Sequence, residues 1–173
     1  MGKGLIHLYT GDGKGKTTAA AGLAARAAGY GRRVVFTQFL KGRRSGETSS
    51  LEQLGIRVVR SDRDFGFVWD MDDEEKRAFR DEQMRLLEET RRIIADKADL
   101  LALDEALGAL ETGLLDEQEL SRFIAQKPEG LELVLTGRNA PEWLVEKADY
   151  VTEMKKIKHP FDLGVSARKS IEY

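Results

Sequence analysis

The residues best suited to chemistry form a glycine- and lysine-rich run near the N-terminus. The run spans Thr10, Gly11, Asp12, Gly13, Lys14, Gly15, Lys16, Thr17 and Thr18. Alternate glycines let the backbone turn its N–H groups inward, and a helix that starts here adds the positive end of its dipole. The run therefore predicts a phosphate-binding loop from Gly11 to Thr18, in which Lys16 supplies a charge and Thr17 a hydroxyl for Mg²⁺.

This loop departs from the Walker A spacing at its first position. Thr10 stands where that motif has glycine, so the spacing closes only if Gly11 starts a loop one residue short. We expect such a loop to bind a polyphosphate without presenting the γ-phosphate to an attacking water. A glycine-rich run can also be a plain turn, but strand, glycines, Lys-Thr and helix together favour nucleotide binding.

Two carboxylates, Asp104 and Glu105, end an apolar stretch at residues 99–104 and resemble a Walker B pattern. Carboxylates at a strand tip beside a phosphate loop reach Mg²⁺ directly or through water. A strand followed by two acids also occurs by chance, but the pairing with the phosphate loop favours a metal role. The predicted metal ligands are thus Thr17, Asp104 and Glu105.

Further cations follow two other predicted strands, where open α/β sheets bind their ligands. Lys41 belongs to a basic loop at residues 41–47, and Arg138 follows the stretch 131–135. We interpret Lys41 as a nucleotide contact, with a solvated loop as the equal alternative. Arg138 is a candidate phosphate or ribose contact, the alternative being a surface salt bridge.

An aromatic segment at residues 61–71 carries Phe65, Phe67 and Trp69 among aspartates, without helical or strand periodicity. Such side chains either pack down as a local plug or form an apolar wall for a flat ligand. On the residues alone, the plug is favoured.

Alternating strand and helix patterns position these groups. Strands are predicted at residues 4–9, 33–39, 56–60, 99–104, 131–135 and 150–152, and helices at residues 16–28, 48–54, 72–97, 116–126 and 141–147. Right-handed crossovers then give an α/β fold of the P-loop NTPase type, a three-layer arrangement with a mostly parallel sheet and helices on both faces. We expect one domain over residues 1–173, whose tail from about residue 153 is either solvated or a lid on the nucleotide.

The amino-acid composition argues against several classes of function. The 173 residues carry 28 Lys and Arg against 30 Asp and Glu, a net charge of −2, so no basic field suggests binding to nucleic acid or an anionic membrane. The lack of cysteine excludes disulfides, a thiol nucleophile and a thiolate metal site. The apolar N-terminal stretch is too short for a signal peptide or a membrane span, and we expect a cytoplasmic protein.

The motifs together resemble the P-loop ATP:corrinoid adenosyltransferases. The matching stretches are residues 10–18, 38–42, 66–69, 103–105, 136–141, 148–154 and 158–160. Members of that family usually carry a longer segment before the first strand. Arg168 and Ser170 stand where the family tends to have glutamine and glycine.

The resemblance implies transfer of the 5′-deoxyadenosyl group of ATP to the Co(I) centre of a corrinoid, with release of triphosphate. It also implies a homodimer, an electron-donating reductase as a possible partner, and ATP lying across the loop in the reverse sense to hydrolases. Phe67 and Trp69 match the positions that cover the lower face of the corrin and displace the axial ligand of cobalt. The resemblance therefore makes Lys16, Thr17, Phe67 and Trp69 the expected catalytic residues. It also favours an apolar wall for the corrinoid over a local plug in the aromatic segment.

Two other function classes compete with this expectation. A P-loop NTPase or kinase would need a residue that positions water or an acceptor near the γ-phosphate, and the sequence supplies no recognisable one. A non-catalytic, ATP-gated corrinoid carrier or sensor would bind both ligands without turnover.

Overall fold

The computed structural model describes residues 2–66 and 68–172. In chain order its elements are β1 (Ile6–Thr10), α1 (Lys16–Gly29), β2 (Val34–Gln38), α2 (Gly46–Gln53), β3 (Arg57–Arg60), the 3₁₀ turn η1 (Val68–Asp70), α3 (Asp73–Ala95), β4 (Leu100–Asp104), α4 (Ala106–Glu111), α5 (Glu117–Ala125), β5 (Glu132–Thr136), α6 (Glu142–Lys147), β6 (Tyr150–Glu153) and the 3₁₀ turn η2 (Pro160–Leu163). The predicted strands and helices are confirmed to within a residue or two at each end. The short helix α4 was not predicted, because six residues that follow a strand directly show no helical period.

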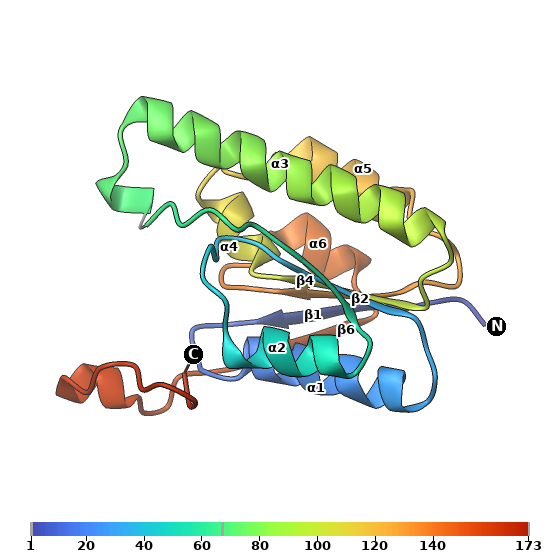
Figure 1. The fold of residues 1–173 in the computed structure, drawn as a ribbon, viewed down its shortest axis with the longest axis horizontal. Helices are drawn as coiled ribbons and strands as arrows, with labels where there is room; N and C mark the ends of the chain where they lie inside the picture. The colour runs from blue at the N-terminus through green and yellow to red at the C-terminus, as the bar shows by residue number, and fades with distance from the viewer. Residues whose placement is uncertain (1, 67, 173) are drawn as a thin grey trace.

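The six strands form one sheet in the order β3-β2-β4-β5-β1-β6, and every neighbouring pair is parallel. The sequence predicted a mostly parallel sheet, and the described sheet is parallel throughout. The chain moves from β1 toward one edge through α1 and α2, then back across the sheet through the later helices. Right-handed crossovers therefore place α1 and α2 on one face and α3 to α6 on the other (Figure 1).

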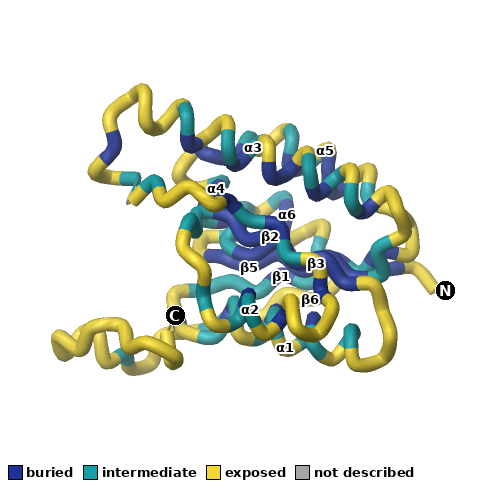
Figure 2. The backbone as a smooth tube through the Cα atoms, viewed as in Figure 1, coloured by how far each residue is buried: buried dark blue, intermediate teal, exposed yellow. Residues whose placement is uncertain are grey.

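Apolar side chains fill both interfaces between the sheet and its helices. Phe36 and Val134 face α1, whose small residues Ala20 and Ala24 are fully buried and let that helix approach the sheet closely. The opposite face buries a larger cluster that includes Leu103 and side chains of α3 to α6. Figure 2 shows the buried strands between the two helical layers, while the segment after β6 is almost entirely exposed.

The long helix α3 begins where its sequence predicted. The Asp72 side chain accepts hydrogen bonds from the N–H groups of Glu74 and Glu75, and the Glu75 carboxylate accepts one from the Asp72 N–H. This reciprocal capping box satisfies N–H groups that have no partner within the helix. It also fixes the end of the aromatic segment that precedes α3.

Because all strands run the same way, their carboxyl ends meet at one edge of the sheet. β1 leads there into the phosphate loop, β2 into Lys41, β4 into Glu105 and β5 into Arg138. Non-glycine residues with positive φ occur at this edge, namely Leu40, Glu105 and Asn139. Strained backbone of this kind tends to occur at functional sites. Within the described ranges, no helix is both long and apolar enough to cross a membrane.

Candidate functional site

The phosphate loop is pressed against the chain that follows β6. A Cβ atom at Gly11 or Gly13 would lie 2.6 Å from the Met154 carbonyl oxygen, so neither position accommodates a side chain. Gly11 and Gly15 also adopt φ values of 101° and 119°, which favour glycine. The glycines are therefore required by this close approach as well as by the turn.

One loop N–H is already used inside the protein. The Gly13 N–H donates to the Met154 carbonyl at 2.6 Å, and the Met154 N–H donates to the Thr10 carbonyl at 2.8 Å. The sequence predicted a cradle of inward N–H groups, but the Gly13 N–H is bonded to the chain itself. The loop thus has fewer free donors than its glycine count suggests.

Lys16 occupies the centre of the loop. Its ammonium nitrogen Nζ donates to the carbonyl oxygens of Gly11 and Gly13 at 2.7 and 2.8 Å. Burial lowers the pKa of this ammonium, and the Arg138 charge lowers it further, whereas the nearby carboxylates, chiefly Glu105, raise it. The ammonium is thus fixed in a partly desolvated position, where a positive charge attracts an anion more strongly than in water.

Asp104 is fully buried and its carboxylate is held by neighbouring side chains. Oδ1 accepts from the Thr136 hydroxyl at 2.8 Å, and Oδ2 accepts from Gln38 Nε2 at 3.1 Å. Lys41 Nζ lies 3.5 Å from Oδ2. Asp104 therefore anchors groups at the ends of β2 and β5 rather than facing open space.

Glu105 faces the cavity that Asp104 does not reach. Its backbone N–H donates to Thr136 Oγ1 at 3.0 Å, so one hydroxyl holds both acidic residues. Burial and then the charge of Asp104 raise the pKa of the Glu105 carboxyl, while Lys41, Lys16 and Arg138 oppose that rise. Of the two predicted acids, Glu105 is the one placed to meet a ligand.

A cavity of about 800 Å³ opens at this edge of the sheet. It is lined by Asp12, Gly13, Lys14, Gly15, Lys16, Thr17, Thr18, Ala21, Lys41, Arg44, Gly46, Glu47, Ser50, Glu105, Arg138, His159, Lys169, Ser170, Ile171 and Glu172. Most of the predicted phosphate-binding residues therefore come together, as do Lys41 and Arg138. Gly11 and Asp104 are not among the residues that line it.

The last residues of the described chain close one side of this cavity. Lys14 Nζ lies 3.1 Å from a Glu172 carboxylate oxygen and 3.5 Å from the Ile171 carbonyl oxygen. The Arg168 guanidinium also binds Glu172 and holds the pKa of that carboxyl at about 2, with a contribution from Lys14. The tail thus lies across the phosphate loop, although Figure 1 shows the preceding η2 projecting away from the body.

Sequence reasoning missed several residues that build the site. Thr136 and Gln38 hold Asp104, and Ser50 lines the cavity. Arg44 of the basic loop 41–47 and His159 of the matching stretch 158–160 also line it, and no role was predicted for either. Gln38 and Thr136 end their strands beside Asp104, a position that could have marked them. The tail was predicted to be either solvated or a lid, but the contact of Glu172 with Lys14 had no local signal, because 158 positions of sequence separate the two residues.

Thr136 offers a direct test of this arrangement. Thr136→Val removes the hydroxyl at nearly constant shape and leaves a buried carboxylate oxygen without its donor, so we expect a loss of about 1–3 kcal/mol in the free energy of unfolding. Urea denaturation measures this loss. Thr136→Ser, which keeps the hydroxyl, serves as the matched control, and equal losses in both variants would contradict the assigned role.

In the aromatic segment, Phe65 packs down as the plug interpretation predicted, whereas Trp69 does not. Phe65 stacks on Phe79 with 4.4 Å between ring centroids, and Phe65 and Val68 pack against the buried cluster of Met71, Phe79 and Leu114. Trp69 is instead 76% exposed and does not line the cavity. The predicted residue Phe67 lies outside the described residues.

Known proteins resemble this chain over nearly its whole length. The family model described as "ATP:corrinoid adenosyltransferase BtuR/CobO/CobP" matches residues 2–173. A corrinoid adenosyltransferase of Escherichia coli K12 is 35% identical, over 99% of this chain and 86% of its own length. One from Sinorhizobium sp. is 38% identical, over 99% of this chain and 81% of its own length.

Among solved structures, a KaiC-like protein from Pyrococcus horikoshii OT3 has a TM-score of 0.52 at 20% identity, covering 91% of this chain and 75% of that one. This likeness shows the fold alone. The family match and the relatives, each spanning nearly the whole chain, give the assignment. The chain belongs to the ATP:corrinoid adenosyltransferase family.

Proposed function

We propose that this enzyme transfers the 5′-deoxyadenosyl group of ATP to the Co(I) centre of a corrinoid and releases triphosphate. The observation that carries the proposal is the cavity that gathers Lys16, Thr17, Glu105 and Arg138 in a chain of this family. In the reaction an electron pair of Co(I) forms the Co–C5′ bond. The C5′–O5′ bond breaks, and its pair leaves with triphosphate.

The protein's main electrostatic task is to stabilise charge that grows on the leaving triphosphate. Lys16, Lys14, Lys41 and Arg138 all line the cavity, so several cations surround the proposed phosphate position. Gly11, Asp12, Gly13, Gly15 and Thr18 complete the proposed nucleotide-binding set. The shortened loop and the occupied Gly13 N–H support a nucleotide held in the reverse sense, with its ribose directed toward the acceptor.

The donor set near Thr17 fits Mg²⁺. Mg²⁺ in phosphate-binding sites uses one or two protein oxygens plus substrate phosphates, and Thr17 and Glu105 offer these in one cavity. Asp104, with both oxygens engaged, would act on the ion through water or by fixing its neighbours. When bound, Mg²⁺ would neutralise phosphate charge.

Trp69 and Phe67 are the proposed wall for the corrinoid. Phe65 and Val68 pack against the buried cluster of Met71, Phe79 and Leu114, so the chain is anchored directly before the exposed Trp69, whose apolar ring can cover one face of a flat substrate. Covering that face would block the axial position of cobalt without coordinating it. Removal of the axial donor makes Co(II) easier to reduce.

We also propose a domain organisation, an oligomeric state and a cellular location for this protein. The chain forms one domain over residues 1–173, and its tail from about residue 153 closes over bound ATP, as the contacts of Glu172 and Lys14 support. We propose a homodimer that receives its electron from a reductase. The need for ATP supports a cytoplasmic location.

The experiment that tests the function is an incubation of the protein with ATP, Mg²⁺ and chemically reduced corrinoid. We expect a light-sensitive Co–C product by absorbance and triphosphate as the phosphate product. Orthophosphate alone would support an NTPase instead. Binding of both ligands without turnover would support a carrier.

A further inference from the structure

Two loops at the carboxyl edge of the sheet touch through their backbones at Gly42. A Cβ atom added to Gly42 would lie 2.0 Å from the Arg63 carbonyl oxygen and 2.6 Å from the Asp64 Cα atom. Real Cβ atoms do not approach backbone atoms this closely. Any side chain at residue 42 would therefore force the two loops apart.

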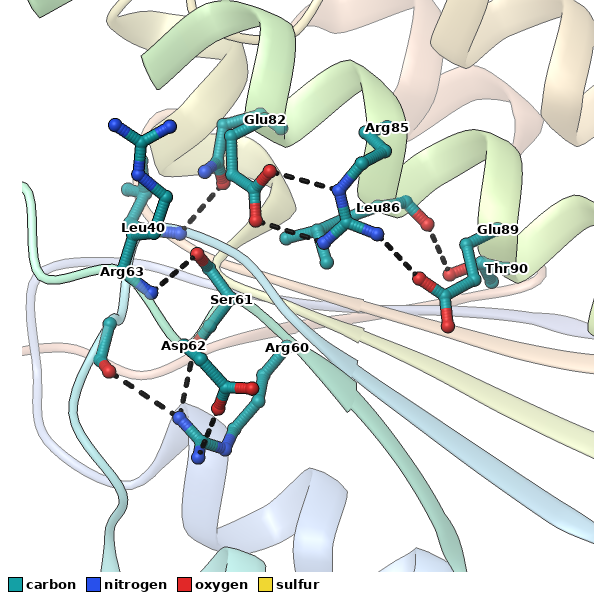
Figure 3. Close-up of polar contacts among 12 residues, drawn as sticks. Leu40, Arg60, Ser61, Asp62, Arg63, Glu82, Arg85, Leu86, Glu89 and Thr90 are labelled. Carbon is teal, nitrogen blue, oxygen red and sulfur yellow. Dashed lines mark hydrogen bonds and ion pairs between the residues drawn. The ribbon is translucent and has the colours of Figure 1, made fainter. Parts of the chain in front are cut away.

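Arg60, the last residue of β3, forms hydrogen bonds to both loops and stabilises the contact between Gly42 and Arg63. Its guanidinium donates from Nη1 to the Ser61 carbonyl at 2.9 Å and, at 3.4 Å, to the Gly42 carbonyl. The Arg63 N–H donates to Ser61 Oγ at 3.0 Å, which fixes the start of the aromatic segment (Figure 3). An ion pair between Arg43 and Asp64 at 2.5 Å crosses the same junction, but its exposure makes its contribution small.

The residues beside Gly42 connect the two proposed substrate sites. On one side Lys41 lines the cavity and reaches Asp104. On the other side the Leu40 N–H donates to Gln83 Oε1 of α3 at 2.9 Å (Figure 3). The Leu40 side chain packs against the same buried cluster of Met71, Phe79 and Leu114 as Phe65 and Val68 do. Residues 40–42 therefore join a cavity wall to the buried cluster that anchors Val68, the residue directly before Trp69.

We infer that Gly42 is a positioning residue that makes the cavity wall and the aromatic segment move as one body. The inference rests on the proposed function, and it adds that nucleotide in the cavity acts on residues 61–71 through the backbone contact of Gly42 with Arg63. Coupling between two sites needs a physical element that both of them bias. Here that element is the pair of touching loops.

The test uses Trp69 as a reporter. The chain has two tryptophans, so Trp143→Phe leaves Trp69 as the only one. In this parent we expect MgATP to change Trp69 emission and to protect peptides covering residues 61–71 from hydrogen exchange. Adding Gly42→Ala should reduce both changes by about half or more, because loops that are forced apart no longer form one element that both sites bias, while ATP still binds.

The matched control is Gly22→Ala, because Gly22 lies within α1 and a Cβ there meets nothing within 4 Å. It should leave both responses unchanged. Should Gly42→Ala fail to fold by circular dichroism, Arg60→Met removes the donors to Gly42 and Ser61 without steric conflict and should weaken the responses in the same direction. Full responses in the folded variant, or no response in the parent with ATP bound, would overturn the inference.

These readouts need ATP binding alone, so they are independent of adenosyl transfer. If the parent responds to ATP but makes no Co–C product, the coupling stands and the proposed function fails. If the parent makes product but the Gly42→Ala variant shows the full responses to ATP, the proposed function stands and the coupling inference fails.

Discussion

Replacing Lys16 by alanine is expected to lower the rate of adenosyl transfer by about 10²- to 10³-fold, the usual cost of removing one preorganised donor from a developing negative charge. The ammonium is held at the centre of the loop by the carbonyls of Gly11 and Gly13, so it needs little reorganisation to meet the triphosphate. Its partial burial strengthens that interaction relative to water. The measurement is the initial rate of Co–C bond formation with prereduced Co(I) corrinoid and saturating ATP.

Lys3→Ala is the matched control, because Lys3 is exposed and precedes β1, whereas the loop follows the other end of that strand. The Lys3→Ala variant should form the Co–C bond at the same rate as the unsubstituted protein. A Lys16→Ala variant that keeps its rate, with normal folding by circular dichroism, would show that the leaving group departs without help from this ammonium. The proposed nucleotide placement would then be wrong.

Local sequence patterns predicted the elements, because their determinants are local. The capping box of Asp72 and Glu75 marks the start of α3 within four residues of sequence, and Lys16-Thr17 marks the start of α1. The parallel order of the sheet then brings Lys16, Glu105 and Arg138 to one edge. For this reason a site of such composition was predictable without coordinates.

The contacts that refine the site depend on distant parts of the chain. The Gly13 N–H is satisfied by Met154, and Glu172 reaches Lys14 from the other end of the sequence. Nothing near Gly42 indicates that Arg63 will press against it. Such contacts follow from how the elements pack, and a periodicity of two or 3.6 residues carries no information about them.

Replacing Trp69 by alanine is expected to separate the two stages of the proposed reaction. With prereduced Co(I), nucleophilic attack no longer depends on emptying an axial position, so the rate should fall by only a few-fold. With Co(II) and a reductant, we expect a fall of about 10²-fold, which corresponds to roughly 120 mV at 59 mV per tenfold change for one electron. The ATP affinity should stay unchanged, because Trp69 does not line the cavity.

Trp69→Phe decides whether the apolar ring or the particular indole matters. Phenylalanine also blocks an axial position without donating electrons to cobalt, so this variant should recover most of the Co(II)-dependent rate. The absorbance of bound Co(II) corrinoid gives a second readout, since loss of the axial ligand changes it before any transfer occurs. If alanine slows both starting states equally, Trp69 only helps to bind the corrinoid. If neither rate changes, the exposed Trp69 ring does not cover the corrinoid, which then binds elsewhere.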